Sequence, residues 1–486
     1  MFLFLSLLVI SWAPQSHSEF TVVLPDSNSP LLDSPQTGFS TRARTDPEEQ
    51  KAVYQIMAST GNSWAGSIPD VCRGRWHGIE CTPDTDDVYH VVSLSFGALS
   101  DDTAFPTCDR TTATLHRLKL THLRTLFFYR CFGGNPQPIP AFLGQLGPTL
   151  RSLVLRENGH VGAIPAELGN LTSLKLLDLH GNRLGSGIPP ALGKLTRIRK
   201  LDLSDNFLTG RIPKLNMPDL NVLDLSRNSL QGRVPTFLTN SDPLIKLDLS
   251  RNRLTGPIPD SVNDLRNLIL LDLSHNSLSG PLPNSLEGLI SLRALILKGN
   301  FMGPATIPVN GLSGLKELSS LVLSNMGLKG PIPESIGELT KLRVLHLDGN
   351  ELNGSIPLSF RNLEKLSELR LENNKLTGLI PFGKEMVWRM GRKLRIENNT
   401  GLCYDMRQGS MDGFDSLSGV SYCDPQANSV GDCGGLNGST IQHLVVSDPP
   451  GSGSKLSLSG SDGRGNLVGR AVGLVTGFLV LVLLIL

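Results

Sequence analysis

Residues 244–267 read LIKLDLSRNRLTGPIPDSVNDLRN and carry a pattern that recurs through most of this 486-residue chain. Leucines stand at fixed positions, an asparagine follows them, and a Gly-x-Ile-Pro segment ends the unit. The unit returns about every 24 residues. Its asparagine falls at Asn158, Asn182, Asn206, Asn228, Asn252, Asn276, Asn300, Asn350 and Asn374.

A period of this length is typical of a leucine-rich repeat solenoid. In each unit, leucines such as Leu247 and Leu249 point inward from a short strand, and the asparagine side chain pairs with backbone groups that would otherwise be buried unsatisfied. Because one coil cannot bury its apolar face alone, coils must stack. We therefore predict a curved right-handed superhelix over residues 89–400, with about twelve coils and a concave parallel β-sheet.

Composition agrees with this architecture. The chain has 50 Gly, 32 Pro and 5% aromatic residues, which suits a turn-rich solenoid better than a compact α/β enzyme. A net charge of +1 gives no electrostatic reason to expect nucleic acid as a partner. The sequence lacks the G-x-S-x-G, H-E-x-x-H, P-loop and kinase signatures, so we expect no catalytic residues, no cofactor and no metal.

Residues 1–18 have the apolar run and small residues of a secretory signal peptide. A lead-in and cap follow over residues 19–88. Asp46 is a good N-cap, Pro47 suits the first helical position, and Glu49 completes a capping box. The predicted helix ends at Gly61, and its apolar stripe would cover the open end of the first coil: Ala52, Val53, Ile56 and Met57.

The segment DVCRGRWHGIEC at 70–81 resembles the N-terminal cap of plant extracellular leucine-rich repeat proteins, with Trp76 and Gly78 between its cysteines. That resemblance implies a Cys72–Cys81 disulfide. Zinc is the rival interpretation of two close cysteines, but no second pair with metal-ligand spacing accompanies them.

Other segments extend the resemblance: PQTGF at 35–39, AVYQIM at 52–57, the long run from Val88 to Asp109, and LVLREN at 153–158. Together they resemble the kinase-less leucine-rich repeat receptor-like proteins of plants that restrain stomatal patterning. The resemblance implies a co-receptor on the extracellular face of the plasma membrane that regulates stomatal patterning and epidermal cell fate. The implied partners are Erecta-type leucine-rich repeat receptor kinases and secreted cysteine-rich epidermal patterning peptides. An extracellular inhibitor of microbial glycan-degrading enzymes, built on the same repeat, is the alternative.

Five further cysteines lie along the chain. Cys108 and Cys131 bracket a coil, and Cys131 occupies a ladder position, so we pair them, with two free buried thiols as the alternative. In the C-terminal cap, residues 401–433, we pair Cys403 with Cys423. Cys433 then remains, either free or in competition for Cys403.

The concave face supplies the candidate binding site, because strand residues alternate and those between the leucines point away from the core. The middle coils place aspartates there, which is also what the repeat consensus dictates. The two flanks carry off-consensus side chains, which suit a partner surface. Our partner-binding candidates are Phe127, Tyr129, Val154, Arg156, Ile296, Val322, His346 and Arg370.

Two irregularities interrupt the repeat. The coil between Asn206 and Asn228 is short, with KLNMPDL in place of the usual return. Met326 holds a ladder position, next to the longer segment FMGPATIPVNGL at 301–312. We expect local bending or a protruding loop there.

The remaining signals concern the cell surface. Sequons stand at Asn170, Asn353, Asn398 and Asn437. A flexible Gly/Ser-rich linker at 434–466 precedes a hydrophobic membrane-anchor segment at 467–486. Ser459 or Ser461 followed by a polar spacer fits a glycolipid-anchor site, with a single-pass span as the alternative.

Overall fold

The computed structural model describes residues 44–74, 78–97, 107–108, 113–115, 119–236, 243–309, 311–399, 401–404 and 420–423. The signal peptide, Cys433, the sequon at Asn437, and the linker and anchor segment with Ser459 and Ser461 lie outside these residues. Among the described helices, none combines the length and the apolar character needed to cross a bilayer.

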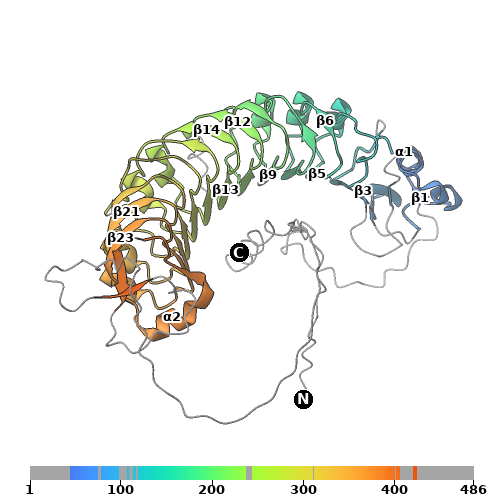
Figure 1. Cartoon of the computed structure of the whole chain (residues 1–486). Coiled ribbons are helices and arrows are strands. Elements are labelled where there is room, and N and C mark those ends of the chain that lie inside the picture. The colour runs from blue at the N-terminus through green and yellow to red at the C-terminus, as the bar shows by residue number, and fades with distance from the viewer. Residues whose placement is uncertain are drawn as a thin grey trace, which may run out of the picture. The chain divides into compact units, whose positions relative to one another are not determined.

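One long sheet runs through the described residues and takes a strand from each coil (Figure 1). It has 15 strands, parallel except for β2, which pairs with β3 in antiparallel fashion. The strands are β1 (Arg44–Thr45), β2 (Ile79–Pro83), β3 (Val88–Phe96), β4 (Thr125–Tyr129), β5 (Ser152–Arg156), β7 (Leu176–Asp178), β9 (Lys200–Asp202), β11 (Val222–Asp224), β13 (Lys246–Asp248), β15 (Leu270–Asp272), β17 (Ala294–Ile296), β18 (Ser320–Val322), β20 (Val344–His346), β22 (Glu368–Arg370) and β24 (Leu394–Arg395).

The outer side of the coils consists mostly of short 3-10 helices, and each follows a proline in an extended conformation, such as Pro259. They are η2 (Ala141–Gln145), η3 (Ala166–Asn170), η4 (Pro190–Lys194), η6 (Asp260–Asp264), η7 (Asn284–Gly288), η8 (Glu334–Glu338) and η9 (Leu358–Asn362). Paired strands lie about 4.8 Å apart, whereas helical turns need about 10 Å. The array from β3 to β24 therefore curves with the long sheet on its inner side (Figure 1). The short coil between Asn206 and Asn228 has no helix in its return.

A second set of short parallel strands runs beside the long sheet, and the sequence analysis did not predict it. Most of these strands follow the L-x-G-x-I-P part of the repeat, the last two belong to the C-terminal cap, and together they form three separate small sheets. The strands are β6 (Val161–Gly162), β8 (Arg183–Leu184), β10 (Thr209–Arg211), β12 (Ser229–Gly232), β14 (Arg253–Gly256), β16 (Ser277–Leu278), β19 (Lys329–Pro331), β21 (Glu351–Gly354), β23 (Lys375–Leu379), β25 (Gly401–Tyr404) and β26 (Ser421–Tyr422).

The ladder asparagines connect neighbouring coils as predicted. Asn252 is buried, and its Nδ2 donates to the Leu225 carbonyl of the preceding coil at 2.9 Å. Its Oδ1 accepts the N–H of Leu230 at 3.0 Å. The leucines of all coils form one continuous core, which is the stacking that the repeat requires.

The N-terminal cap contains α1 (Pro47–Ser59) and η1 (Ser63–Ser67). Asp46 caps α1 by accepting the N–H groups of Glu48 and Glu49, and the predicted apolar stripe is buried. The capping box is incomplete, because the N–H of Asp46 donates to the Tyr89 carbonyl and not to Glu49.

Three disulfides join Cys72 to Cys81, Cys108 to Cys131, and Cys403 to Cys423, with Cα–Cα distances of 5.7, 4.9 and 5.0 Å. The zinc and free-thiol alternatives are therefore wrong. Before the last bond lie α2 (Lys384–Met390) and η10 (Gly391–Lys393), which the sequence analysis missed.

Candidate functional site

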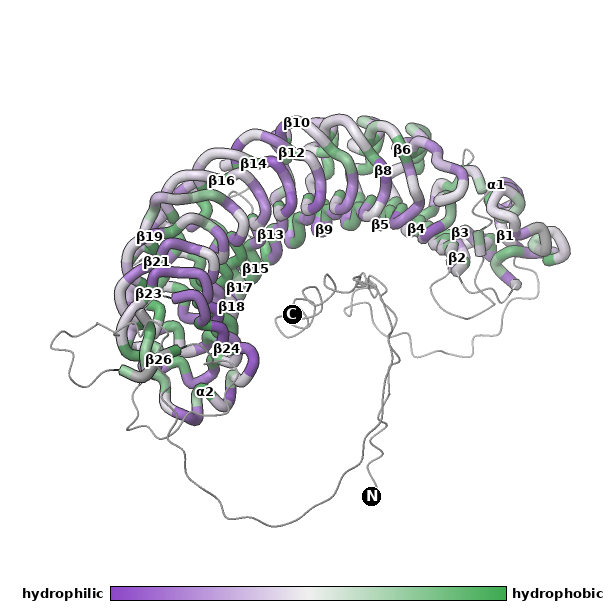
Figure 2. The backbone as a smooth tube through the Cα atoms, viewed as in Figure 1, coloured by the Kyte–Doolittle hydropathy of each residue, from purple (hydrophilic) through white to green (hydrophobic). Residues whose placement is uncertain are grey.

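The concave face is built by the register of the long sheet. Leu201, Leu223, Leu247 and Leu271 pair in line from coil to coil, so the residues that follow them also form a column. In Figure 2, strands β15, β17 and β18 are coloured as hydrophobic. The column between the strand leucines reads Phe127, Val154, Asp178, Asp202, Asp224, Asp248, Asp272, Ile296, Val322, His346 and Arg370.

The aspartates in the middle of this column hold the backbone that follows each strand. Asp224 Oδ1 accepts the N–H and the hydroxyl of Ser226 at 3.1 and 2.7 Å. Asp202 and Asp248 make the same two contacts with Ser204 and Ser250. This repeated turn supports the interpretation of the aspartates as repeat consensus.

Burial and mutual repulsion disfavour the charged form of two aspartates in this column. Burial and the neighbouring charges of Asp224 and Asp178 raise the pKa of Asp202 to about 7. Burial also raises the pKa of Asp248 well above its usual range, with the charges of Asp224 and Asp272 adding to the shift.

Basic side chains relieve part of this repulsion. Burial opposes ionisation of Asp224, but the ammonium of Lys246 and the hydrogen bonds from Ser226 together outweigh it and hold the pKa of Asp224 below its usual value. Lys246 Nζ lies 3.1 Å from Asp224 Oδ2, and Arg156 lies 3.2 Å from Asp178. The partner-binding candidate Arg156 thus already neutralises one end of the column.

The N-terminal flank brings Phe127, Tyr129, Val154 and Arg156 together on the paired strands β4 and β5. Val154 and Tyr129 are nearly buried, whereas Phe127 is half-buried between Ser95 and Val154 of the adjacent strands. Phe127 is therefore the most accessible apolar side chain of this group.

The C-terminal flank is less accessible than the sequence analysis expected. Ile296 and Val322 are 2% and 0% exposed, and with Val344 they form a small cluster separate from the main core. Their orientation away from the core is as expected, but their exposure is not. Neighbouring strands on a concave surface approach closely enough for short side chains to cover one another.

His346 and Arg370 share one carboxylate. Glu368 Oε1 lies 2.9 Å from His346 Nε2 and 2.8 Å from the guanidinium of Arg370. The hydrogen bond from His346, together with the two nearby charges, lowers the pKa of Glu368 to about 2. A partner that binds His346 or Arg370 must compete with Glu368.

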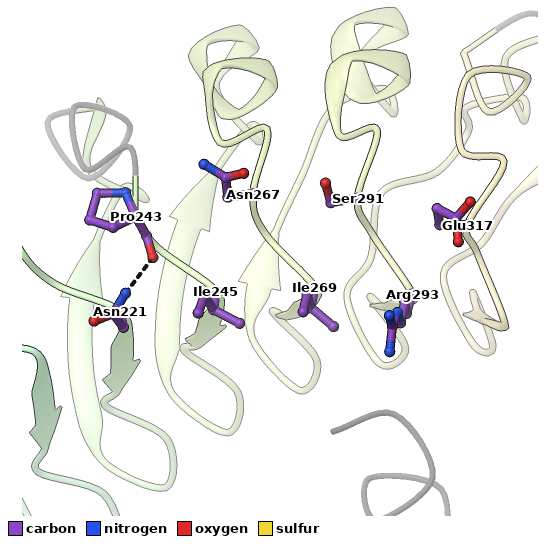
Figure 3. A pocket seen from close by; sticks show the side chains of 8 residues that line it. All are labelled: Asn221, Pro243, Ile245, Asn267, Ile269, Ser291, Arg293 and Glu317. Atoms are coloured by element: carbon purple, nitrogen blue, oxygen red, sulfur yellow. Dashed lines mark hydrogen bonds between the residues drawn. The ribbon is translucent and has the colours of Figure 1, made fainter. Parts of the chain in front are cut away.

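A groove of about 570 Å³ lies beside the long sheet, where the backbone of each successive coil leads into its strand (Figure 3). Ile245 and Ile269 project next to each other, and Arg293 continues the row in the next coil. The sequence analysis missed this groove, although Ile245 and Ile269 stand at variable positions of the repeat. Its other lining residues are Asn221, Pro243, Asn267, Ser291 and Glu317.

Two of the three sequons within the described residues, Asn170 and Asn353, lie outside the strands of the concave face. Asn170 ends η3 on the outer side, and Asn353 lies in β21 of the second set of strands; both are exposed. Asn398 is exposed as well, and its amide donates to Asn373 at 2.9 Å. Glycans on Asn170 and Asn353 would leave the concave face open.

Within the described residues, one group of side chains has the geometry to hold a metal ion: Glu49, His90 and His122 in the N-terminal cap. None of the partner-binding candidates belongs to this group.

Comparisons with known proteins agree with this architecture. Two leucine-rich repeat family models match, one at residues 148–208 and 242–301 and the other at residues 219–241 and 341–363. The protein TOO MANY MOUTHS of Arabidopsis thaliana is 68% identical over 434 residues, which cover 87% of this chain and 86% of that protein.

Two solved structures are similar in fold. The ectodomain of the Arabidopsis receptor kinase HAESA, in complex with an IDA peptide hormone, gives a TM-score of 0.58 at 28% identity. The PEPR1–AtPEP1 structure gives 0.57 at 28% identity. Each match covers 74% of this chain but 57% and 49% of those chains, so this chain spans about half the length of these structures.

Proposed function

The chain belongs to the Too Many Mouths family of plant leucine-rich repeat receptor-like proteins, and from this premise we propose that it is a co-receptor. It binds beside a receptor kinase at the cell surface and changes which peptides that kinase recognises. The result is control of stomatal patterning and epidermal cell fate.

The main support for this proposal is that the residues at the two ends of the concave face differ from the aspartate found at the same position in the middle coils. Aspartates fill the middle coils, whereas an aromatic and basic group on β4 and β5 stands at one end, and Glu368 with His346 and Arg370 stands at the other. A sheet face with different chemistry at its two ends can hold two partners, or one partner in a fixed direction. Phe127 is the apolar contact at the N-terminal end.

The proposed partners are an Erecta-type leucine-rich repeat receptor kinase and a secreted cysteine-rich epidermal patterning peptide. One structural neighbour, the ectodomain of the receptor kinase HAESA, is bound to the IDA peptide hormone, which supports a peptide as the ligand class. The groove formed by Ile245, Ile269 and Arg293 offers a second surface, at which a kinase ectodomain could bind from the side.

The chain works by binding and not by catalysis. Selectivity arises as a difference of affinities for the joint surface of two ectodomains. The hydrophobic segment at 467–486 holds the protein on the plasma membrane, through a glycolipid or as a span.

A linkage experiment tests the proposal. The full-length chain and an Erecta-type kinase are placed in the same vesicles, and the affinity of labelled patterning peptides is measured with and without the chain. We expect the chain to change the affinity for some peptides and not for others. The peptide must then change the affinity between the two receptors by the same factor. Unchanged peptide affinity and no binding to the kinase would contradict the proposal and favour the inhibitor alternative.

A further inference from the structure

Three side chains converge in the N-terminal cap from different elements. Glu49 lies in the first turn of α1, His90 lies on β3, and His122 lies in the turn before β4. Glu49 Oε1 is 2.9 Å from Nδ1 of His122 and 3.3 Å from Nδ1 of His90. The three ligand atoms all lie within 4.8 Å of one another, and the two imidazole rings lie 3.7 Å apart between centroids.

The carboxylate of Glu49 is fixed in this position. It is 3% exposed, and its Oε2 accepts the N–H of Val91 at 2.7 Å, which leaves Oε1 for the histidines. Glu49 is the residue expected to complete the capping box, yet it turns toward β3. Among the described residues, its ion-pair partners are the two histidines.

His90 stands between two carboxylates, since its Nε2 lies 3.3 Å from Asp84 Oδ2. An ionised carboxylate accepts hydrogen bonds but cannot donate, and a neutral imidazole has one N–H. A neutral His90 therefore cannot satisfy Glu49 and Asp84 together. A cation on Nδ1 would allow Nε2–H to donate to Asp84, and this is how carboxylates orient metal-binding histidines.

Asp84 is itself held in place. Its Oδ1 accepts the N–H groups of Asp86 and Val88 at 2.8 and 3.0 Å, which leaves Oδ2 facing His90. Glu49, His90 and His122 would thus be metal ligands, with Asp84 as a positioning residue.

We propose that Glu49, His90 and His122 bind one divalent transition-metal ion of the Zn²⁺ class. Tetrahedral Zn²⁺ with bonds of about 2.0–2.2 Å separates its ligand atoms by roughly 3.3 Å, close to the 2.9 and 3.3 Å observed here. Three protein ligands leave a fourth position for water. The side chain of His122 is 48% exposed, so the ion can enter from solvent.

A bound ion would connect α1 to the first two coils, because its ligands come from α1, β3 and the turn before β4. Binding to the folded state alone raises stability by mass action. The site would therefore strengthen the cap that covers the end of the hydrophobic core.

Titration of the metal-free full-length chain with ZnCl₂ tests the proposal by calorimetry. We expect one ion per chain. His122→Ala and Glu49→Gln should each weaken binding at least about tenfold, and Asp84→Asn should weaken it about 10–100-fold. His275→Ala is the matched control, because it removes an exposed histidine outside the cluster and should leave binding unchanged.

Two further readouts separate a metal site from a loss of fold. Co²⁺ should give the visible absorption of a tetrahedral site in the wild-type chain and in His275→Ala, but not in His122→Ala. Zn²⁺ should raise the Tm of the wild-type chain and not that of His122→Ala. His122 is half-exposed, so its replacement should leave the cap folded. If the wild-type chain binds no Zn²⁺, or if His122→Ala binds it equally well, the cluster is only a hydrogen-bonded set and the proposal is wrong.

Discussion

The N–H of Met326 donates to Oδ1 of Asn350 at 2.9 Å, although Met326 occupies a position that the repeat assigns to an asparagine. The next asparagine thus binds the coil before it as it would in a regular ladder. In place of the missing amide, the carbonyl oxygen of Met326 accepts the N–H groups of Met302 and Gly303, each at 3.0 Å. The ladder is therefore a series of separate links between coils, and one link can be replaced by backbone.

Asn252→Ala should destabilise the solenoid more than the same substitution of an asparagine at an exposed position. It removes the donor to Leu225 and the acceptor for the Leu230 N–H, both in buried surroundings. Each backbone group left unsatisfied costs about 1–3 kcal/mol, so we expect a loss of about 3 kcal/mol or more. Denaturant unfolding followed by circular dichroism measures it. Asn284→Ala, at an exposed position, should change stability by less than about 0.5 kcal/mol, and equal effects would contradict the ladder's role.

Gly303→Ala should disrupt the segment that carries the irregular coil. A Cβ at Gly303 would overlap the carbonyl oxygen of Gly327, which is backbone and cannot rotate away. We expect a clear fall in the denaturation midpoint and faster proteolysis near this segment. Gly133→Ala is the matched control, because a Cβ there meets nothing within 4 Å. Equal denaturation midpoints for the two variants would show that the segment can shift to accommodate the added Cβ, which would contradict the prediction.

The expected segment at 301–312 does protrude in part. Phe301 and Val309 are 73% and 67% exposed, and Thr306 forms a bridge to Lys329 of the next coil. The sequence could locate the irregularity because the asparagine is missing. It could not predict that the carbonyl oxygen of Met326 would accept the N–H groups of Met302 and Gly303 in place of the missing side chain.

Periodic features were predictable because the same residue types recur at the same positions in each repeat. The strand leucines and the ladder asparagines follow from position alone, and the apolar stripe of α1 follows from helical spacing. The disulfide Cys108–Cys131 needed the structure to exclude two free thiols. Contacts between distant segments were not predictable in this way. Glu49 turns from Asp46 toward His90 and His122, which are 41 and 73 residues away in sequence. The burial of Val322 likewise depends on its neighbours in adjacent coils.

Replacing Asp202 should reduce the pH dependence of stability. Its pKa in the folded state is raised to about 7, well above the usual value, so the stability it contributes is complete below about pH 4 and is lost as pH rises through 7. Asp202→Asn keeps an oxygen for Ser204 and loses the charge. We expect the variant to be more stable than the wild-type chain at pH 8, with the difference shrinking toward pH 4. Asp205→Asn, at an exposed site, should show no such trend.

Removal of the C-terminal tail should release the protein from the membrane. A chain that ends at Asp432 lacks the hydrophobic segment at 467–486, so it should appear in the medium of secreting cells. Immunoblots of medium and membrane fractions measure this. Phospholipase release of the full-length chain would indicate a glycolipid, whereas membrane retention of the truncated chain would contradict the anchor.

Phe127→Asp and Val322→Asp should separate partner binding from stability on the same concave face. Phe127 is half-buried and lies outside the main core, so aspartate there should cost little stability but weaken kinase or peptide binding about tenfold or more. Val322 is 0% exposed between Ile296 and His346, so aspartate there buries a carboxylate and should destabilise the solenoid by several kcal/mol. Binding affinity and denaturant unfolding, measured on both variants, test this. If Phe127→Asp binds both partners as the wild-type chain does, the N-terminal flank is not the contact surface.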